Sequence, residues 1–215
     1  MRNRTENQIK LVLIRHGATK SNQEHRYLGK TDESLSTEGK NELQKAVDEG
    51  CYPQANLVFS SSMRRCIETA EILYPGRTPI VISEWEETDF GDFEGKNAMD
   101  LQDDTRYQAW IDSGGTLPFP GGESRELFSH RCDIGFHKIM ELIPMQTQEN
   151  LCGNLWDCVI AALIVHGGTI MSLLSRYGGG EYFDYQVPNG GGYLCTVRCM
   201  SEGSERFEIR DIKRI

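Results

Sequence analysis

Two apolar segments of this chain each end in a histidine followed by glycine. Residues 11–14 run into Arg15-His16-Gly17, and residues 159–165 run into His166-Gly167-Gly168. Short runs of β-favouring apolar residues with polar flanks are typical of strands that are buried on both faces of a sheet. Ligands bind at the carboxyl edge of such sheets. The pattern therefore predicts an α/β fold in which two imidazoles face one site.

The length and charge of the chain limit its organisation and its partners. With 215 residues, it is long enough for one domain with a substantial core, and we expect a single domain over residues 1–215. Its 23 basic and 32 acidic residues give a net charge of −9. Because an acidic protein binds nucleic acid and anionic membranes poorly, we expect neither as a partner. Any anionic ligand must then be held by a local cluster of arginines.

No segment has the pattern of a membrane span or a targeting signal. The longest apolar stretch, residues 158–165, is far too short to cross a bilayer, and residues 1–9 form a polar leader. The seven cysteines include no C-x-x-C pair, which argues against a disulfide framework or a zinc site. We therefore expect a cytoplasmic protein with reduced cysteines.

Strands and helices alternate along the chain. We expect a loop over 18–35, a helix from Ser36 or Thr37 to near Gly50, and a long helix that starts at Ser124 and ends at Pro144. The other expected elements are strands at 10–15, 57–60, 80–82, 158–165, 193–200 and 207–212, helices at 63–73 and 169–176, a polar loop at 145–157 and a turn at 202–204. This order predicts a three-layer fold: a mostly parallel sheet with helices on both faces and an antiparallel edge.

The pattern changes between residues 85 and 121. Short helical pieces are broken there by Gly91, Gly95 and the run Ser113-Gly114-Gly115. We expect this segment to be a small helical cap, inserted after the third strand into a core of residues 10–84 and 122–215. Its aromatic residues would form a small core of their own, with one or two at the mouth of a substrate site.

Two further motifs follow predicted strands. Residues 60–70 place Arg64 and Arg65 on the first turn of a helix, where a guanidinium and the helix N-terminus attract an anion together. Residues 87–95 place carboxylates, including Glu87, near the same sheet edge. Two arginines, two histidines and one carboxylate are the set of groups that phosphoryl transfer through a phosphohistidine requires.

These four motifs resemble, in order, those of the histidine phosphatase superfamily, also called the phosphoglycerate mutase-like family. The resemblance covers about residues 10–175 and begins with Arg15-His16-Gly17-Ala18-Thr19-Lys20-Ser21-Asn22. It implies that His16 is the nucleophile and Glu87 the proton donor, with Glu84 and Glu86 as rival donors. The resemblance and the glycine motifs together indicate a phosphate and substrate pocket made by Arg15, Asn22, Gly29, Arg65, His166 and Gly167. Arg65 is favoured over Arg64 because it directly precedes the small residue Cys66.

These roles place chemical demands on the residues. His16 must attack through a neutral ring nitrogen, so its other nitrogen should donate to a backbone carbonyl. Glu87 needs a raised pKa to donate a proton, which burial or the nearby acids Glu86 and Asp89 must supply. His166 would add a further donor if it were cationic. No metal or cofactor is required, because the guanidinium groups stabilise the transferred phosphate.

The family resemblance leaves the reaction open, because this fold hosts both mutases and phosphatases. The segment from Lys96 to Ser124 is short and acidic, with Lys96 and Arg106 as its only cations. Because such a cap should release the first product and admit water, we expect hydrolysis of a small phosphorylated metabolite. The alternatives are a cofactor-dependent phosphoglycerate mutase and an inactive module that binds phosphate esters.

Two segments point to a branch of the phosphatases. Residues 89–95 and Pro120-Gly121-Gly122-Glu123-Ser124 resemble the α-ribazole phosphatase and broad-specificity phosphatase branch, which includes enzymes of cobalamin nucleotide-loop assembly. α-Ribazole 5′-phosphate is therefore one candidate substrate. We expect the enzyme to act as a monomer or a homodimer.

Overall fold

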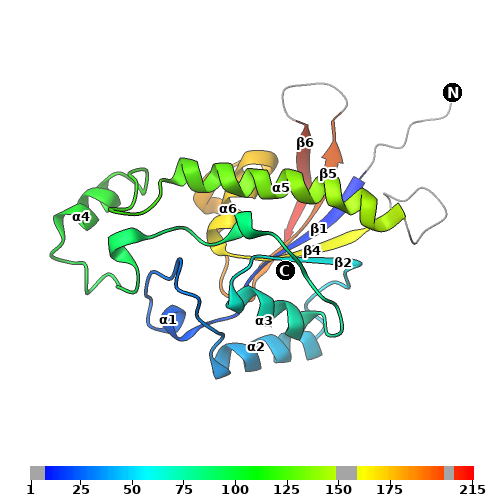
Figure 1. Cartoon of the computed structure of the whole chain (residues 1–215), viewed down its shortest axis with the longest axis horizontal. Coiled ribbons are helices and arrows are strands. Elements are labelled where there is room, and N and C mark those ends of the chain that lie inside the picture. The colour runs from blue at the N-terminus through cyan, green and yellow to red at the C-terminus, as the bar shows by residue number, and fades with distance from the viewer. Residues whose placement is uncertain (1–7, 149–158, 201–205) are drawn as a thin grey trace.

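A six-stranded mixed sheet forms the centre of the molecule (Figure 1). The computed structural model describes residues 8–148, 159–200 and 206–215. The strands lie in the order β3-β2-β4-β1-β5-β6. The first four are mutually parallel, and β5 runs antiparallel to both of its neighbours, β1 and β6. This arrangement confirms the predicted α/β class with an antiparallel edge.

The strands follow the apolar segments of the sequence closely. They are β1 (Gln8–Arg15), β2 (Leu57–Ser60), β3 (Ile80–Val81), β4 (Ile160–Val165), β5 (Gly192–Cys199) and β6 (Phe207–Arg214). The predicted hairpin of the last two strands is present, and its predicted turn at 202–204 lies outside the described residues.

Helices connect the strands and cover the sheet. They are α1 (Lys20–Gln23), α2 (Thr37–Asp48), α3 (Arg64–Leu73), α4 (Thr105–Asp112), α5 (Arg125–Gln148) and α6 (Gly167–Gly178), with 3-10 turns η1 (Ser83–Trp85), η2 (Gly91–Phe93) and η4 (Tyr182–Tyr185). The hydroxyl of Ser36 accepts a hydrogen bond from the Gly39 N–H and caps α2, as predicted.

Alternate residues of β1 supply the cores on the two faces of the sheet. Leu11 and Leu13 pack on the side covered by α5 and α6, together with Phe136. Val12 and Ile14 pack on the other side, with residues of α2 and α3. Figure 1 shows the same three layers, with α5 and α6 on one face of the sheet and α2 and α3 on the other. Burial of each such side chain stabilises the fold by about 1.5–3 kcal/mol.

The register between β1 and β4 brings the two histidines to one edge. Arg15 pairs with Val165, and the His16 N–H donates to the carbonyl of Val165 at 2.9 Å. The two strands therefore end at the same level of the sheet. The two following imidazoles, those of His16 and His166, lie with their ring centroids 5.2 Å apart.

Aromatic rings gather in and beside the segment predicted as a cap. Phe93 is fully buried, and Tyr107 and Phe119 contact it at centroid distances of 5.5 and 6.0 Å. Trp110 packs on Phe119, with centroids 5.0 Å apart. Tyr27, from the loop after α1, contacts all four of these rings and ties the segment to the first motif.

Three predictions of local structure were wrong. The loop at 18–35 contains the helical turn α1, which Thr19 and Asn22 cap reciprocally. Helix α6 begins at Gly167, directly after the strand, rather than at Thr169. Helix α5 does not end at Pro144 but continues to Gln148. A proline removes one backbone donor from a helix, and the packing of the buried residues before it outweighs that loss.

The remaining predictions concern cysteines and unplaced segments. Cys51, Cys66, Cys132, Cys195 and Cys199 are free thiols, as predicted, and Cys152 and Cys158 lie outside the described residues. The polar leader and most of the loop at 145–157 also lie outside them. Among the described residues, no helix has the length and apolar character needed to cross a membrane.

Candidate active site

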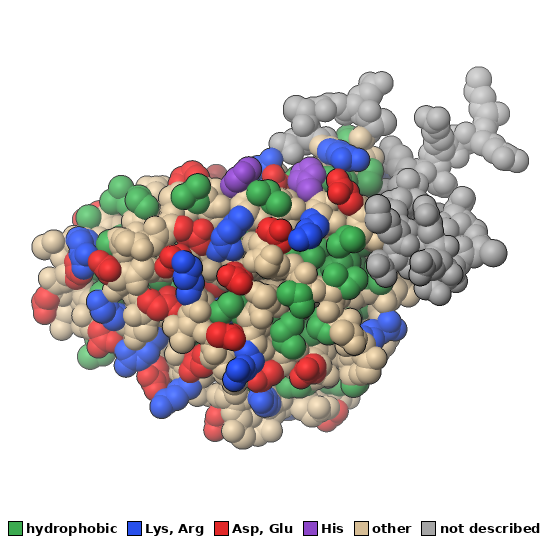
Figure 2. Space-filling model, in the orientation of Figure 1, with side chains coloured by type: hydrophobic (Ala, Val, Ile, Leu, Met, Phe, Trp, Pro, Cys, Tyr) green, Lys and Arg blue, Asp and Glu red, His purple; other side chains and the backbone are tan. Residues whose placement is uncertain are grey.

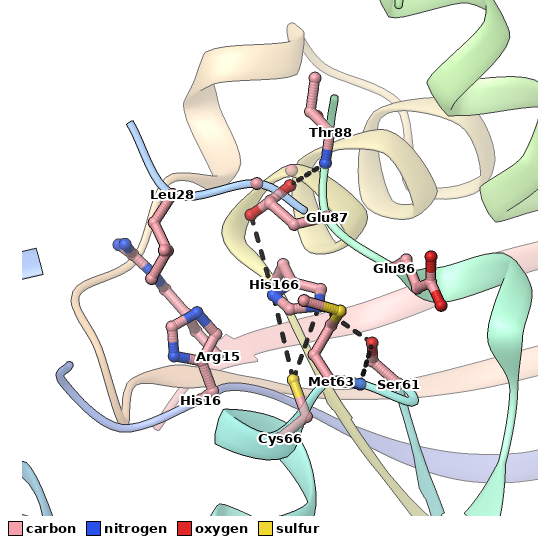
Figure 3. A network of polar contacts seen from close by, with 12 residues as sticks. Arg15, His16, Leu28, Ser61, Met63, Cys66, Glu86, Glu87, Thr88 and His166 are labelled. Atoms are coloured by element: carbon pink, nitrogen blue, oxygen red, sulfur yellow. Dashed lines mark hydrogen bonds and ion pairs between the residues drawn. The ribbon is translucent and has the colours of Figure 1, made fainter. Parts of the chain in front are cut away.

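His16 lies where β1 ends, with its ring held by its own neighbour (Figure 3). Its Nδ1 is 2.8 Å from the carbonyl oxygen of Gly17. Because a carbonyl only accepts hydrogen bonds, Nδ1 carries the proton, and Nε2 carries the lone pair. The ring is 3 % exposed and lines a cavity. The side chain thus has the tautomer that a nitrogen nucleophile needs.

The surroundings of His16 keep its ring neutral. Burial lowers its pKa well below the ordinary value, and the charges of Arg65 and Arg15 lower it further. The nucleophilic lone pair on Nε2 is therefore available at neutral pH.

Arg15 and Arg65 are held by backbone carbonyls rather than by carboxylates. Arg15 Nη1 donates to the carbonyl of Val187 at 2.8 Å, and Arg65 donates to the carbonyls of Thr31 and Gly29, both at 2.9 Å. Both Nε–H groups are buried, and among the described residues neither has a hydrogen-bond acceptor. Fully buried Arg65 and half-buried Arg15 therefore each keep a free donor for an anion.

Glu87 and His166 lie next to each other. Oε2 of Glu87 is 3.9 Å from Nδ1 of His166, and Nε2 of His166 is 3.0 Å from the Ser61 hydroxyl. Figure 3 shows the Glu87 carboxyl above the His166 ring. Burial, followed by the charge of Arg65, lowers the pKa of His166 well below its usual range. The ring is thus a neutral donor rather than the cation considered from the sequence.

Burial alone supplies the raised pKa of Glu87. It outweighs the hydrogen bond from the Thr88 N–H and the charges of three arginines, all of which lower that pKa. The acids proposed from the sequence are engaged elsewhere: Glu86 accepts from the Ser62 hydroxyl at 2.7 Å, and Asp89 pairs with Lys30 at 2.6 Å. Of the two sources considered from the sequence, burial therefore raises the pKa of Glu87, and the nearby acids do not.

Two asparagines connect the site to its loops. Asn22 lines the cavity, and its Oδ1 accepts hydrogen bonds from the Thr19 N–H at 3.2 Å and from Asn189 Nδ2 at 3.1 Å. With its oxygen engaged, the amide nitrogen of Asn22 is available as a donor. Asn189 Nδ2 also donates to the His16 carbonyl at 3.1 Å. It thereby fixes the backbone at His16.

The two predicted glycines have different positions. Gly167 lines the cavity at the start of α6, where a Cβ would lie 3.6 Å from Arg15 Nε. Gly29 is not among the cavity-lining residues. Its carbonyl holds Arg65, and its N–H donates to Glu94 at 2.9 Å. A Cβ on Gly29 would come within 2.1 Å of the Thr88 carbonyl, so only glycine allows this close approach.

The cavity has a volume of about 320 Å³ and opens from His16 toward the cap. Its inner end contains Arg15, His16 and Glu87, while Arg65 and His166 lie behind this surface. The outer part is lined by the aromatic side chains of Tyr27, Phe90, Trp110, Phe119, Phe128, Tyr182 and Phe183. The cavity thus joins a polar end to a largely aromatic chamber.

Two arginines reach the chamber, and only one of them is neutralised by carboxylates. Arg26 pairs with Glu24 and Asp100, both at 2.7 Å. Arg125 lies 5.3 Å from the centre of the Tyr182 ring and has no ion pair among the residues the structure describes. On the face shown in Figure 2, acidic and basic side chains are interspersed.

The sequence analysis missed four residues of this region: Asn189, Arg125, Arg131 and Tyr182. Asn189 lies in the run Pro188-Asn189-Gly190-Gly191, a turn signal that was available in the sequence. The other three, two in α5 and one at the start of η4, have no distinctive local pattern. Only packing brings them to the site.

Comparison with known proteins shows the family to which the chain belongs. The family model described as the histidine phosphatase superfamily (branch 1) matches residues 11–212. The chain belongs to this superfamily. The match includes the segments that carry all the candidate site residues of this histidine phosphatase family member.

Curated relatives of this superfamily member include phosphatases. A glucosyl-3-phosphoglycerate phosphatase of Mycolicibacterium vanbaalenii is 29% identical, over 88% of this chain and 83% of that protein. An adenosylcobalamin/alpha-ribazole phosphatase of Escherichia coli is 27% identical, over 78% of each chain.

A solved structure shares the fold. The putative alpha-ribazole-5'-P phosphatase of Escherichia coli superposes with a TM-score of 0.72 at 22% identity, over 95% of this chain and 96% of that one.

Proposed function

We propose that this protein is a metal-independent phosphomonoester hydrolase that acts through a phosphohistidine on a small phosphorylated metabolite. The observation that carries the proposal is the position of the His16 lone pair on Nε2, beside two guanidinium groups whose buried Nε–H donors are free. A neutral nucleophile and an unneutralised anion pocket together suit attack on a phosphate ester.

The first half-reaction transfers the phosphoryl group to His16. The Nε2 lone pair forms the bond to phosphorus, and the ester P–O bond breaks with its electron pair on the alcohol oxygen. Arg15 and Arg65 hold the non-bridging oxygens, with Asn22 and the Gly167 N–H as further donors. Glu87 gives its proton to the departing oxygen. Its burial, which favours the protonated form, suits it to this step.

The second half-reaction releases inorganic phosphate. Glu87, now ionised, takes a proton from water as the water oxygen bonds to phosphorus. The P–N bond breaks, and its electron pair returns to Nε2 of His16. Both groups are then back in their starting states.

The electrostatics of the chamber favour hydrolysis over a mutase reaction. A mutase must retain a bisphosphorylated intermediate, which requires several unpaired cations beyond the first phosphate. The cap segment contributes only Lys96 and Arg106, and Arg106 is neutralised by Asp92 and Asp104 at 2.7 Å. With Arg26 also paired, Arg125 is left as the cation at the chamber. The first product is therefore free to leave before water enters.

The aromatic chamber supports an ester whose alcohol carries a flat apolar group. α-Ribazole 5′-phosphate, the candidate considered from the sequence, has such a group. The Escherichia coli relative and the Escherichia coli structure of similar fold are both named as alpha-ribazole phosphatases. A polyhydroxylated alcohol would leave many hydroxyls without partners against these rings. We also propose that the enzyme acts in the cytoplasm, as a monomer or a homodimer.

Hydrolysis of p-nitrophenyl phosphate in the presence of EDTA tests the proposal. We expect turnover in the wild type, a ³²P-labelled phosphohistidine on rapid acid-free quenching, and loss of both in His16→Ala. His130→Ala, at an exposed histidine of α5, is the matched control and should retain activity. Absence of turnover on a panel of monoesters would refute the enzyme and favour the binding module. Interconversion of phosphoglycerates stimulated by the bisphosphate would favour the mutase.

A further inference from the structure

Arg131 of α5 holds the segment that carries Glu87 by its backbone. Its Nη1 donates to the carbonyls of Glu84 and Glu86, at 3.0 and 2.5 Å, and its Nη2 donates to the carbonyl of Glu87 at 2.9 Å. One guanidinium thus binds three carbonyls within four consecutive residues. Glu84 lies in the single turn η1, and Glu86 and Glu87 follow this turn, so no continuing helix fixes these carbonyls.

The Arg131 guanidinium is itself fixed from two sides. Glu123 accepts from Nη2 at 2.6 Å and from Nε at 3.2 Å, which makes a bidentate ion pair. The guanidinium also lies over the ring of Phe128, with its carbon 4.7 Å from the ring centroid. The planar guanidinium of Arg131 therefore has a defined orientation, which a lysine ammonium could not reproduce.

Glu123 also binds the backbone on the C-terminal side of Glu87, at Asp89. Its Oε1 also accepts from the Asp89 N–H at 2.9 Å, and its own N–H donates to the Asp89 carbonyl at 3.0 Å. A Cβ on Gly122 would lie 2.2 Å from the Asp89 carbonyl oxygen, so the two backbones are in direct contact. Glu87 is therefore held on its N-terminal side by Arg131 and on its C-terminal side by Glu123.

We propose that Arg131 and Glu123 are positioning residues that set the Glu87 carboxyl for proton transfer to the leaving group. This assigns a role to the motif Pro120-Gly121-Gly122-Glu123-Ser124, which the catalytic set does not use. The inference rests on the proposed function of Glu87. Neither positioning residue lines the cavity, whereas Glu87 does.

A pair of esters with the same ring distinguishes positioning from general stability. p-Nitrophenyl phosphate releases a stabilised phenolate, which needs little protonation, whereas p-nitrobenzyl phosphate releases a basic alkoxide, which needs the proton of Glu87. Since kcat/KM reports the steps up to departure of the alcohol, its ratio for the two esters measures proton donation. A variant that only loses folded protein lowers both values equally.

Three variants and one control make the test. For Glu87→Gln, we expect kcat/KM to fall by about 10²–10⁴-fold on the nitrobenzyl ester and by under about tenfold on the nitrophenyl ester. Arg131→Lys should show the same selective loss, about 10–100-fold against under about threefold, because displacement of a catalytic group by about 1 Å is enough for such a loss. Glu123→Gln should show a smaller loss of the same kind.

Lys138→Met is the matched control. Lys138 lies two helical turns along α5 and contacts the same segment, at the Glu84 carboxylate, 3.2 Å away. It binds none of the three carbonyls, so both esters should keep their kcat/KM within about twofold, as expected for an exposed ion pair.

Two results would overturn the inference. The first would reject only the positioning role, and the second would also reject the proposed mechanism. Equal losses on both esters in Arg131→Lys and Glu123→Gln, with a selective loss in Glu87→Gln, would show that the two residues only stabilise the fold. No selective loss in Glu87→Gln would remove Glu87 as the donor and the proposed mechanism with it. If Arg131→Lys does not fold, Glu123→Gln decides the outcome alone.

Discussion

The Glu87 carboxyl and the His166 imidazole lie 3.9 Å apart; His166 is fully buried, and Glu87 is half-buried at the wall of the cavity. Burial raises the pKa of Glu87 and lowers that of His166, so the neutral form is favoured in each. The pair thus combines a carboxyl whose pKa is raised with a neutral imidazole. This arrangement keeps a proton at the place where the proposed leaving group departs.

The pH dependence of kcat/KM should be bell-shaped with an optimum on the acid side of neutrality. Activity requires His16 without its second proton and Glu87 with its proton. Burial and the charges of Arg65 and Arg15 place the His16 pKa well below 6.5, which sets the acid limb. Burial places the Glu87 pKa above 4.5, which sets the alkaline limb. An optimum above neutral pH in a full kinetic profile would contradict these assignments.

Replacement of Arg15 by glutamine should weaken anion binding and shift both limbs of that profile. The lost charge-assisted contacts should raise the inhibition constant of vanadate by about 10–100-fold. Because Arg15 lowers the pKa of both His16 and Glu87, its removal should move both limbs to higher pH. Arg64→Gln is the control: Arg64 is exposed and does not line the cavity, so inhibition should be unchanged.

Gly29→Ala should lower both stability and activity, although Gly29 does not line the cavity. Its Cβ would lie 2.1 Å from the Thr88 carbonyl, which forces apart two backbones that hold Arg65 and Glu87. Overpacking of this kind costs about 1–3 kcal/mol, to be measured by urea unfolding. The adjacent substitution Lys30→Ala, at an exposed side chain, should cost under about 1 kcal/mol. Equal costs for both would contradict the structure.

Trp110→Ala should change substrate preference without removing catalysis. The indole lines the chamber and packs on Phe119, far from the phosphate contacts. Its loss should raise KM for α-ribazole 5′-phosphate or an aryl ester by about tenfold, which corresponds to one aromatic contact of about 1–1.5 kcal/mol. KM for a small alkyl phosphate should change by under about twofold. A uniform change would mean that the chamber does not bind the alcohol.

Phe136→Ala should destabilise the protein by about 3–5 kcal/mol. The ring is fully buried under the sheet and contacts Tyr177 and Phe207, at centroid distances of 4.6 and 5.6 Å. Thermal and urea unfolding would measure the loss. Ile134→Ala, on the exposed side of the same helix, is the control and should change stability by under about 0.5 kcal/mol.

Local patterns were enough to predict the framework of the fold. Apolar runs with polar flanks marked the strands, and Ser36 marked the start of α2, because strand burial and helix capping depend on neighbours in the sequence. The same reasoning failed at Pro144. A proline disfavours a helix locally, and the tertiary packing that outweighs it is not visible in the local sequence.

The sequence by itself determined the family, the order of the strands and helices, and the set of candidate residues, since motifs and periodicity are written in adjacent positions. Only the tertiary structure decided which nitrogen of His16 carries the lone pair, why the pKa of Glu87 is raised, and that Asn189 and Arg131 hold the backbones of these two residues. These properties depend on burial and on contacts between segments far apart in the chain. Both arise only when the sheet brings its strand ends together.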